Sequence, residues 1–364
     1  MFISCVNHLK KLDWILITAA FLLVAMGLVS LYSFSLGKGD FFNFKKQIIF
    51  LGIGFILMMG LSFLDWRMFR ESPYFILILY FFCLLALLGL FFFAPITRGV
   101  RGWYKFDNLS FDPTEITKIV LIIILAKYFS MRHVEMYKLR HILLSGFYIF
   151  LPAVLISRQP NLGTALILIA LWLGILIISG IKLRHFLLLI FCGLLILLIG
   201  WNFLLKDYQK ERIIGFLAPQ IDPLGVNWSQ TQAKIAIGAG GILGQGFGKG
   251  SQTQYGFLPE PHTDFIFAAI AEEFGLVGVS ALFFLFLILL WRTTKIAILS
   301  QSNFPRLFAS GFIIILSAEF FINVGMNLGI LPVIGIPLPF VSYGGSGLIA
   351  GFIGLGILQG IRSH

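Results

Sequence analysis

The sequence predicts an all-α integral membrane protein, a bundle of about ten transmembrane helices. Of the 364 residues, 59% are hydrophobic and only 12% charged, and the mean hydropathy is +0.95. This composition exceeds what a soluble core requires. Apolar runs of about 20 residues, the length that crosses a bilayer, recur along the whole chain. They lack the alternating polarity of barrel strands, which are about 10 residues long.

The predicted spans are residues 14–34, 47–64, 74–95, 114–131, 142–157, 162–180, 184–205, 263–291, 307–331 and 341–360. The fourth and fifth are shorter than the rest or interrupted by charge. A long polar loop, residues 206–262, precedes the eighth span. The first apolar run is too long for a signal peptide and has no small-x-small cleavage site. We therefore expect one membrane domain over residues 1–364.

The distribution of Lys and Arg predicts the orientation. Fourteen lie on the side that carries both chain ends, against seven in the short loops of the other side. Because cytoplasmic loops carry the excess of positive charge, both termini are predicted to be cytoplasmic and the 206–262 loop to face outward. The net charge of +11 reflects this bias and attraction to anionic lipid, so nucleic acid is not a required partner.

The fourth span begins with charged residues. Asp112 is a good helix N-cap, and Pro113 suits the first helical turn. Glu115 and Lys118 are three residues apart, so they share a helix face and can pair. Capping alone explains Asp112 and Pro113 but not Lys118, which lies a turn deeper. Two interpretations stay open: simple capping, or a pair that serves or supports a functional site.

The 206–262 loop contains seven glycines between Gly238 and Gly250. Glycine-rich backbone can approach a ligand closely and present N–H groups to an anion. A nucleotide P-loop is not expected, because Gly248-Lys-Gly-Ser251 does not fit its pattern. The glycines are compatible with a flexible lid or with a phosphate cradle.

Acidic and proline-rich segments mark the outer ends of the last three spans. Asp264 follows Glu260 and His262 where the long loop enters an apolar helix, and an ionised side chain at that depth is usually functional. Three prolines between residues 332 and 339 prevent a continuous helix, so this segment must pack against protein or line a wet cavity. Glycine pairs in the last span indicate tight helix packing. Glu319 has no obvious local partner and either lines the bundle interior or lies near an edge.

These regions bring charged side chains to one outer face: Asp264, Glu260, His262, Arg101, Lys118, Arg212 and Lys234. Cations, a carboxylate and a lipid-facing groove suit an amphiphilic substrate with an anionic head, such as a lipid diphosphate. The carboxylate of Asp264 would accept a proton from an attacking hydroxyl. Serine-hydrolase and zinc-protease motifs are missing. A diphosphate makes Mg²⁺ or Mn²⁺ a candidate cofactor, and no nucleotide is expected.

Four motifs in order resemble the SEDS family of bacterial shape, elongation, division and sporulation proteins. They are Gln159-Pro-Asn-Leu-Gly-Thr164, Ala236-Ile-Gly-Ala-Gly-Gly241, Leu258 to Phe267 followed by Ala271-Glu-Glu-Phe-Gly275, and Pro337-Leu-Pro-Phe-Val-Ser-Tyr-Gly-Gly-Ser346. The resemblance runs nearly end to end. The segments Ser251-Gln-Thr-Gln254 and Asp222-Pro-Leu-Gly225 are more similar to the RodA branch than to the FtsW branch.

The resemblance implies a peptidoglycan glycosyltransferase that polymerises lipid II during cell elongation. Asp264, in the His262-Thr263-Asp264 motif, corresponds to the essential acid, while Glu115 and Lys118 correspond to residues that support the substrate cavity. The other residues in family motifs are Arg101, Trp103, Gln159, Arg212, Gln232 and Ser342. Asn161 stands where the family usually has Asp, and Gly102 separates two residues that are commonly adjacent. A class B penicillin-binding protein and other elongation proteins are the implied partners.

Three alternatives remain at this point. A lipid II flippase would suit ten spans and buried charges, but it needs polar groups through the bilayer midplane. A division-specific FtsW-type paralogue would share the chemistry. A non-catalytic scaffold for a penicillin-binding protein would leave Asp264 unexplained.

Overall fold

The computed structural model describes residues 8–95, 101–107, 109–131, 139–203, 206–218, 225 and 227–363. Arg98, Arg132 and Lys138, which contributed to the charge count, lie outside these residues, as does the 222–224 part of the loop motif. Each predicted span corresponds to a helix: α2 (Trp14–Lys38), α3 (Phe42–Ser62), α5 (Pro73–Phe93), α6 (Pro113–Ser130), α7 (Leu139–Arg158), α8 (Leu162–Ile178), α9 (Leu183–Phe203), α13 (Ile266–Leu299), α14 (Asn303–Leu328) and α15 (Gly345–Ser363).

Eight of these helices are long and apolar enough to cross a membrane. The other two are α8, which is apolar but has only 17 residues, and α6, which carries three charged side chains. The protein is therefore an all-α, multi-pass membrane protein. Several helix ends differ by a few residues from the predicted spans, and the differences in α13 and α15 bear on the site. Helix α13 begins after Asp264 and continues to Leu299, and α15 begins at Gly345 because the proline-rich segment before it is not helical.

The segment between α9 and α13, predicted as a loop, is partly helical. It contains α10 (Asp207–Leu217), α11 (Trp228–Gly240) and the short α12 (Ser251–Gln254). Two further elements were not predicted: the short helix α4 (Arg67–Glu71) and an antiparallel hairpin of β1 (Tyr104–Phe106) and β2 (Leu109–Phe111). The Tyr104 hydroxyl donates to the Ala86 carbonyl of α5 at 2.7 Å, which fixes the hairpin on the bundle.

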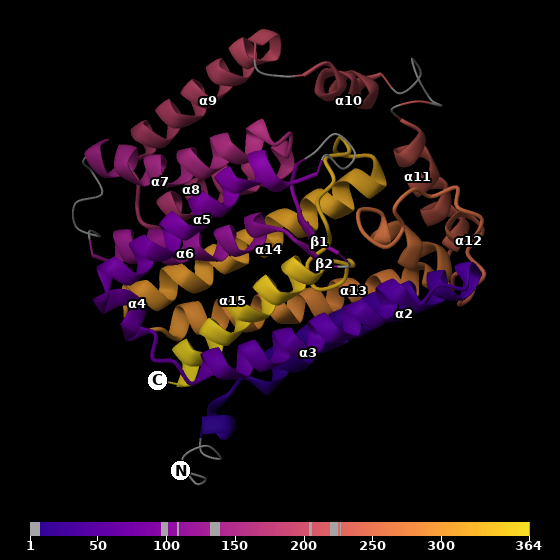
Figure 1. Cartoon of the computed structure of the whole chain (residues 1–364), viewed down its shortest axis with the longest axis horizontal. Helices are drawn as coiled ribbons and strands as arrows, with labels where there is room; N and C mark the ends of the chain where they lie inside the picture. Colours follow the sequence, from indigo (N-terminus) through magenta and orange to yellow (C-terminus); the bar gives the residue numbers. More distant parts are fainter. Residues whose placement is uncertain are drawn as a thin grey trace.

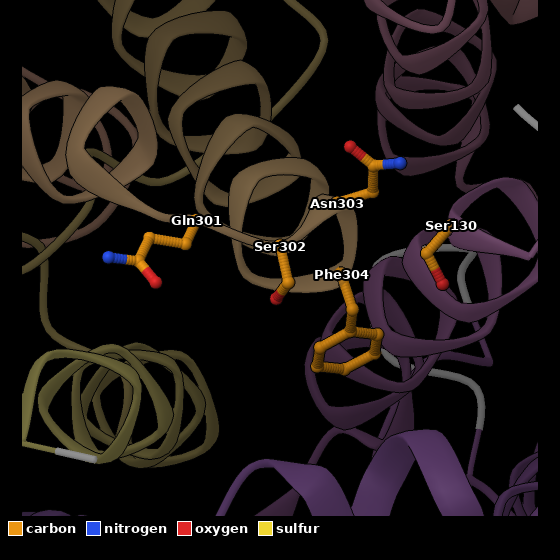
Figure 2. Close-up of a pocket in the computed structure, with 5 residues that line it drawn as sticks. All are labelled: Ser130, Gln301, Ser302, Asn303 and Phe304. Carbon is orange, nitrogen blue, oxygen red and sulfur yellow. The ribbon is translucent and has the colours of Figure 1, made fainter.

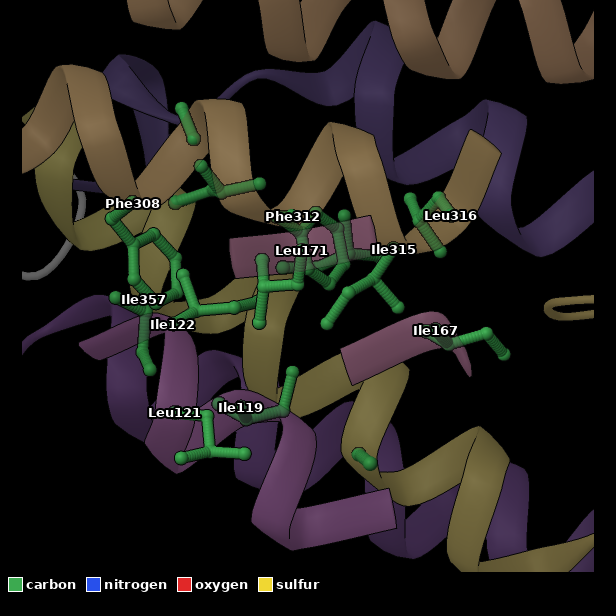
Figure 3. Close-up of a cluster of buried hydrophobic side chains, with 14 of the residues drawn as sticks. Ile119, Leu121, Ile122, Ile167, Leu171, Phe308, Phe312, Ile315, Leu316 and Ile357 are labelled. Atoms are coloured by element: carbon green, nitrogen blue, oxygen red, sulfur yellow. The ribbon is translucent and has the colours of Figure 1, made fainter. Parts of the chain in front are cut away.

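Helix α14 lies inside the bundle and packs against α6, α8 and α13 (Figure 1). Interlocking apolar side chains from α6, α8, α14 and α15 fill the space between them, among them Ile122, Leu171, Phe312 and Ile357 (Figure 3). Within a bilayer such packing, rather than exclusion of water, holds helices together. Helix α9 is drawn apart from the bundle, and most of its side chains are exposed.

Glycines let α15 approach α3 closely. A Cβ added at Gly356 would lie 2.8 Å from the Met58 carbonyl oxygen, and one at Gly360 would lie 2.9 Å from that of Leu64. Since real side chains do not tolerate such approaches, these two positions require glycine. The predicted tight packing of the last span is confirmed here.

A buried ion cluster joins the start of α2 to the ends of α13 and α15. Asp13 is 2% exposed and receives hydrogen bonds from Arg292 Nε at 2.9 Å and Arg292 Nη2 at 2.6 Å. Arg362 approaches the same carboxylate at 2.6 Å. Asp13 was not among the residues predicted to be functional or structural. The cluster places the start of α2 and the C-terminal end of the chain at the same end of the bundle (Figure 1).

The glycine-rich segment after α11 pairs its backbone with a break in α13. Gly275 has φ 62°, which interrupts the helix. The Leu276 amide donates to the Gly241 carbonyl, and the Gln245 amide to the Glu272 carbonyl, both at 2.9 Å. A Cβ at Gly244 would overlap the Glu273 carbonyl oxygen. These glycines allow backbone to pack on backbone, so neither a flexible lid nor a phosphate cradle describes the segment.

Candidate active site

A cavity of about 480 Å³ opens among α6, α14, α15 and the segments that precede α13 and α15. Eight of the predicted site residues line it: Trp103, Glu115, Lys118, Arg212, Glu260, Thr263, Asp264 and Ser342. They come from parts of the chain separated by more than two hundred positions. The structure thus brings most of the predicted site together.

The wall of the cavity is amphiphilic. The charged side chains of Asp264, Glu260 and Arg212 come from the segments outside the spans, whereas Ile315 and Leu348 come from the helices α14 and α15. Such a wall suits a ligand that has both a polar head and an apolar chain, because each part meets a surface of its own kind.

Asp264 immediately precedes the N-cap of α13 and is half-buried. Its carboxylate faces Gly335, where an added Cβ would lie 3.4 Å from Asp264 Oδ2. Gly335 has φ +72°, a conformation that glycine adopts at little cost. The carboxylate therefore lies against backbone of the proline-rich segment at the cavity wall.

The proline-rich segment holds the backbone of the His262-Thr263-Asp264 motif. The Tyr343 amide donates to the His262 carbonyl at 2.8 Å, and the Ser342 hydroxyl donates to the Thr263 carbonyl at 2.7 Å. Phe340, between the prolines and Ser342, has φ 63°, which is strained for a bulky residue. Ser342 lines the cavity as predicted, and its hydroxyl is used to fix this turn.

Lys118 lies between two carboxylates. Its Nζ is 2.8 Å from Glu115 Oε2 and also donates to Glu319 Oε1. The predicted pairing of Glu115 with Lys118 is confirmed, and Glu319 lines the interior rather than an edge. An ammonium group with two carboxylate partners has little capacity left for a third anion. This cluster therefore shapes the cavity wall and joins α6 to α14.

Asp112 caps α6 and also lines the cavity. It accepts hydrogen bonds from the Thr114 amide at 2.8 Å and the Thr114 hydroxyl at 2.6 Å, which confirms the predicted cap. Burial, with repulsion from the Glu115 carboxylate, raises the pKa of Asp112 to about 7. The Asp112 carboxyl group therefore changes its protonation state near neutral pH. Its role as a helix cap did not indicate this property.

Five predicted site residues do not line the cavity. Arg101 Nη1 donates to the Phe91 carbonyl at 2.8 Å, so this guanidinium is aimed at the end of α5. Gln159 is buried and donates to the Leu87 carbonyl at 2.7 Å. The others are Gln232, which is buried in α11, Lys234, which is exposed beside Gly329, and His262, whose ring lies 5.8 Å from that of Tyr343.

Asn161 lines the cavity at the start of α8. Its Oδ1 accepts from the Thr164 amide at 3.2 Å, which caps the helix. Both Asn and Asp perform this task. The departure from the family pattern therefore preserves the local fold and removes one negative charge from the cavity wall.

Two buried asparagines on α14, Asn323 and Asn327, were not predicted. Both donate to the carbonyl oxygen of Asp264, at 3.0 and 3.1 Å. Polar amides four residues apart in an otherwise apolar helix were a visible signal, because buried amides require partners. Their partner could not be read from the sequence, since it lies about 60 positions away.

A second hollow, of about 220 Å³, lies where α6 ends and α14 begins. Ser130 and residues 301–304 line it (Figure 2). None of these lining residues is ionisable, so the hollow has no group for acid–base chemistry and is not part of the site.

The described residues contain no group of three His, Cys, Asp or Glu side chains that could hold a metal ion. Magnesium ions, however, are commonly bound by one or two carboxylates together with substrate phosphates. Asp264 and Glu260 line the cavity and offer such oxygens. The residues fit a cation that arrives with a diphosphate better than one held by protein alone.

Comparison with known proteins identifies the family. A family model described as cell cycle protein, which takes in FtsW, RodA and SpoVE, matches residues 13–364. The chain belongs to this family. It is the SEDS family that the four motifs indicated, and the match covers every helix of the cavity wall.

Members of the SEDS family are similar to the chain over nearly their whole length. The peptidoglycan glycosyltransferase MrdB of Escherichia coli strain K12 is 36% identical over 98% of this chain and 97% of its own. Stage V sporulation protein E of Bacillus subtilis strain 168 is 33% identical over 97% of both chains.

Solved structures show the same fold. One, from work on a peptidoglycan synthase complex that coordinates polymerization and crosslinking, is 32% identical with a TM-score of 0.82, over 96% of this chain and 97% of that one. The rod shape determining protein RodA of Thermus thermophilus is 30% identical with a TM-score of 0.70, over the same shares.

Proposed function

We propose that this protein polymerises lipid II into glycan strands and that Asp264 is the general base of the reaction. The family, the named relatives and the structural match make it a peptidoglycan glycosyltransferase of cell-wall synthesis. The observation that carries the finer proposal is the position of Asp264 on an amphiphilic cavity, beside a strained, closely held turn.

The shape and chemistry of the cavity support a lipid-linked substrate. The apolar wall formed by α14 and α15 would take the start of the lipid chain, and the charged rim would take the diphosphate and sugar. Arg212 is the cation best placed for the diphosphate, because it lines the cavity and is largely exposed. Lys118, which sequence analysis offered for the same task, is already paired with two carboxylates.

The reaction assigns one proton transfer to Asp264. The carboxylate accepts the proton of the acceptor sugar's 4-hydroxyl as that oxygen attacks C1 of the donor sugar. A new glycosidic C–O bond forms, the bond between C1 and the diphosphate oxygen breaks, and undecaprenyl diphosphate leaves with the electron pair. Arg212 would stabilise the negative charge that develops on that leaving oxygen.

The cellular setting follows from the same reasoning. We place the protein in the bacterial cytoplasmic membrane, with both termini in the cytoplasm and the cavity on the outer face, as one SEDS domain over residues 1–364. The similarity to a complex that couples polymerization with crosslinking supports a penicillin-binding protein as its partner. The RodA-like loop residues favour a role in elongation over one in division.

Polymerisation of lipid II by purified protein tests the assignment of Asp264. Asp264→Asn preserves size and hydrogen-bonding shape but removes the base, so we expect polymer formation to fall at least 100-fold, as general bases contribute about 10²–10⁴-fold. Asp40→Asn is the matched control, because Asp40 is exposed and its carboxylate accepts from the Phe42 amide at the start of α3. Wild-type rates from Asp264→Asn would refute the assignment.

A lipid transporter is less compatible with the bundle. The buried residues of α6 from Ile119 to Ala126 are all apolar, as are those of α14 from Phe304 to Leu316. Along these two helices no polar path continues from the Lys118 cluster toward the other end. Movement of lipid II between leaflets without new glycosidic bonds would favour the transporter.

A further inference from the structure

We infer that Asn323 and Asn327 are positioning residues that set the direction of the Asp264 carboxylate. The inference rests on the proposed function of Asp264 as the base, and it concerns how the fold holds that group. Both asparagines are fully buried on α14, and neither is needed to explain the packing of an apolar helix. A buried amide is costly unless it is hydrogen-bonded, so its partners indicate its purpose.

Asn327 occupies the place of a helical hydrogen bond. In a regular helix the Ala268 amide would donate to the carbonyl of Asp264, four residues earlier. Here the Ala268 amide donates to Asn327 Oδ1 at 3.3 Å, and Asn327 Nδ2 donates to the Asp264 carbonyl at 3.1 Å. The side-chain amide thus separates the two backbone groups and satisfies both. As a result α13 begins after Asp264, and Asp264 stays outside the helix.

Asn323 joins Asp264 to the segment that faces its carboxylate. Its Nδ2 donates to the Asp264 carbonyl at 3.0 Å and to the Ile336 carbonyl at 2.7 Å. An amide nitrogen has two hydrogens, so both are used. Ile336 follows Gly335, the residue against which the carboxylate lies. One side chain therefore fixes the distance between the base and this part of the cavity wall.

Together these contacts give each carbonyl of the motif its own donor. The carbonyls of His262 and Thr263 are held by residues 343 and 342, and that of Asp264 is held by the two asparagines. Because three successive peptide groups are fixed, the Asp264 side chain has only its own torsions to vary. The carboxylate therefore has its working orientation before the substrate binds. Such preorganisation supplies much of the rate enhancement of an enzyme.

The test compares Asn327→Leu with a matched control. Leucine has nearly the shape of asparagine but neither donates nor accepts. The Ala268 amide therefore loses its side-chain acceptor and can donate directly to the Asp264 carbonyl, to which Asn323 still donates. Gln230→Met is the control. Gln230 is a buried amide that donates to the Met326 and Leu331 carbonyls at the same end of α14, at 3.0 and 2.8 Å, without touching Asp264.

With lipid II, we expect Asn327→Leu to lower kcat about 100-fold and to leave KM within threefold, because a misplaced base slows the chemical step rather than binding. Gln230→Met should keep kcat within about threefold. If Asn327→Leu does not fold, Asn327→Asp replaces it; aspartate keeps the acceptor for the Ala268 amide and loses the donor, and the same loss of kcat is expected. A raised KM with unchanged kcat, or an equal loss of kcat in Gln230→Met, would overturn the inference.

Hydrogen exchange, followed by mass spectrometry on residues 258–270, tests the geometry without substrate. We expect at least tenfold faster or slower exchange of this segment in the Asn327 variant, and no change there in Gln230→Met. Unchanged exchange would overturn the inference whatever the activity. A wild-type protein that makes no polymer would instead refute the proposed function, and exchange would still decide whether the asparagines position Asp264.

Discussion

Replacing Lys118 by methionine should destabilise the protein strongly. Lys118 Nζ contacts Glu115 and Glu319, and the three side chains are only 5, 16 and 9% exposed. Methionine fills a similar volume but leaves two carboxylates in a low-dielectric site without a cation. Removing one member of a buried ion pair costs about 3–5 kcal/mol, mostly because the remaining charge loses its partner. We expect a loss in that range, and little change in the helix propensity of α6.

The measurement is the free energy of unfolding in mixed micelles, from reversible denaturant titration followed by helical signal. Arg67→Met is the control, because Arg67 pairs with Asp65 at 3.9 Å with both side chains largely exposed. A surface pair of that kind contributes about 0–1 kcal/mol. The triple variant Lys118→Met, Glu115→Gln, Glu319→Gln should recover most of the stability that the single variant loses.

A Lys118→Met variant that is no less stable than Arg67→Met would contradict a stabilising role for the cluster. A triple variant that does not regain stability would show that the loss comes from packing and not from unpaired charge. Activity is a separate readout. If Lys118 supports the cavity wall without binding the diphosphate, the KM for lipid II of the triple variant should stay within about threefold of wild type.

Three further predictions address the site itself. Gly335→Ala forces a side chain into a left-handed conformation and against Asp264, so we expect about 1–2 kcal/mol of lost stability and about tenfold lower kcat in the lipid II assay; an unchanged kcat would contradict the placement of the carboxylate. Because the pKa of Asp112 is raised to about 7 in the folded protein, the free energy of unfolding should fall as pH rises from about 4 to 7, and Asp112→Asn should remove that part of the slope; equal slopes would contradict it. Polymerisation should stop with a chelator and recover with Mg²⁺ or Mn²⁺, measured against a calcium-only control; full activity in chelator would exclude the cation.

The sequence predicted contacts between residues that are close together in the chain, but it did not predict contacts between distant segments. Glu115 and Lys118 are one turn apart on one helix, so their pairing follows from helical spacing alone. Glu319 joins the same cluster from a position 201 residues away, and nothing near it in the chain indicates that partner. The glycine-rich segment was misread for the same reason, because its counterpart is a break in α13 that depends on Gly275.

The predicted site residues that lie outside the cavity show a second limit of prediction from the sequence. Arg101 was expected on the outer face with other cations, and in the chain it comes shortly before the hairpin, which begins at Tyr104. Its direction is set by the free carbonyl at the end of α5, which accepts from its guanidinium. Charge and position along the chain predict a region of the molecule, but they do not predict which of several acceptors a long side chain will reach.

Because of the break at Gly275, the direction of the backbone around Asp264 does not depend on the direction of the rest of α13. A continuous helix of 34 residues would couple the direction of its first turn to the ion cluster at Arg292, far along the same axis. With the helix interrupted, the first turns of α13 are oriented by α14 and by the glycine-rich segment that pairs with the break. The place of the Asp264 carboxylate on the cavity wall is thus set by contacts around the first turns of α13, and the long apolar part of this helix beyond Gly275 does not make them.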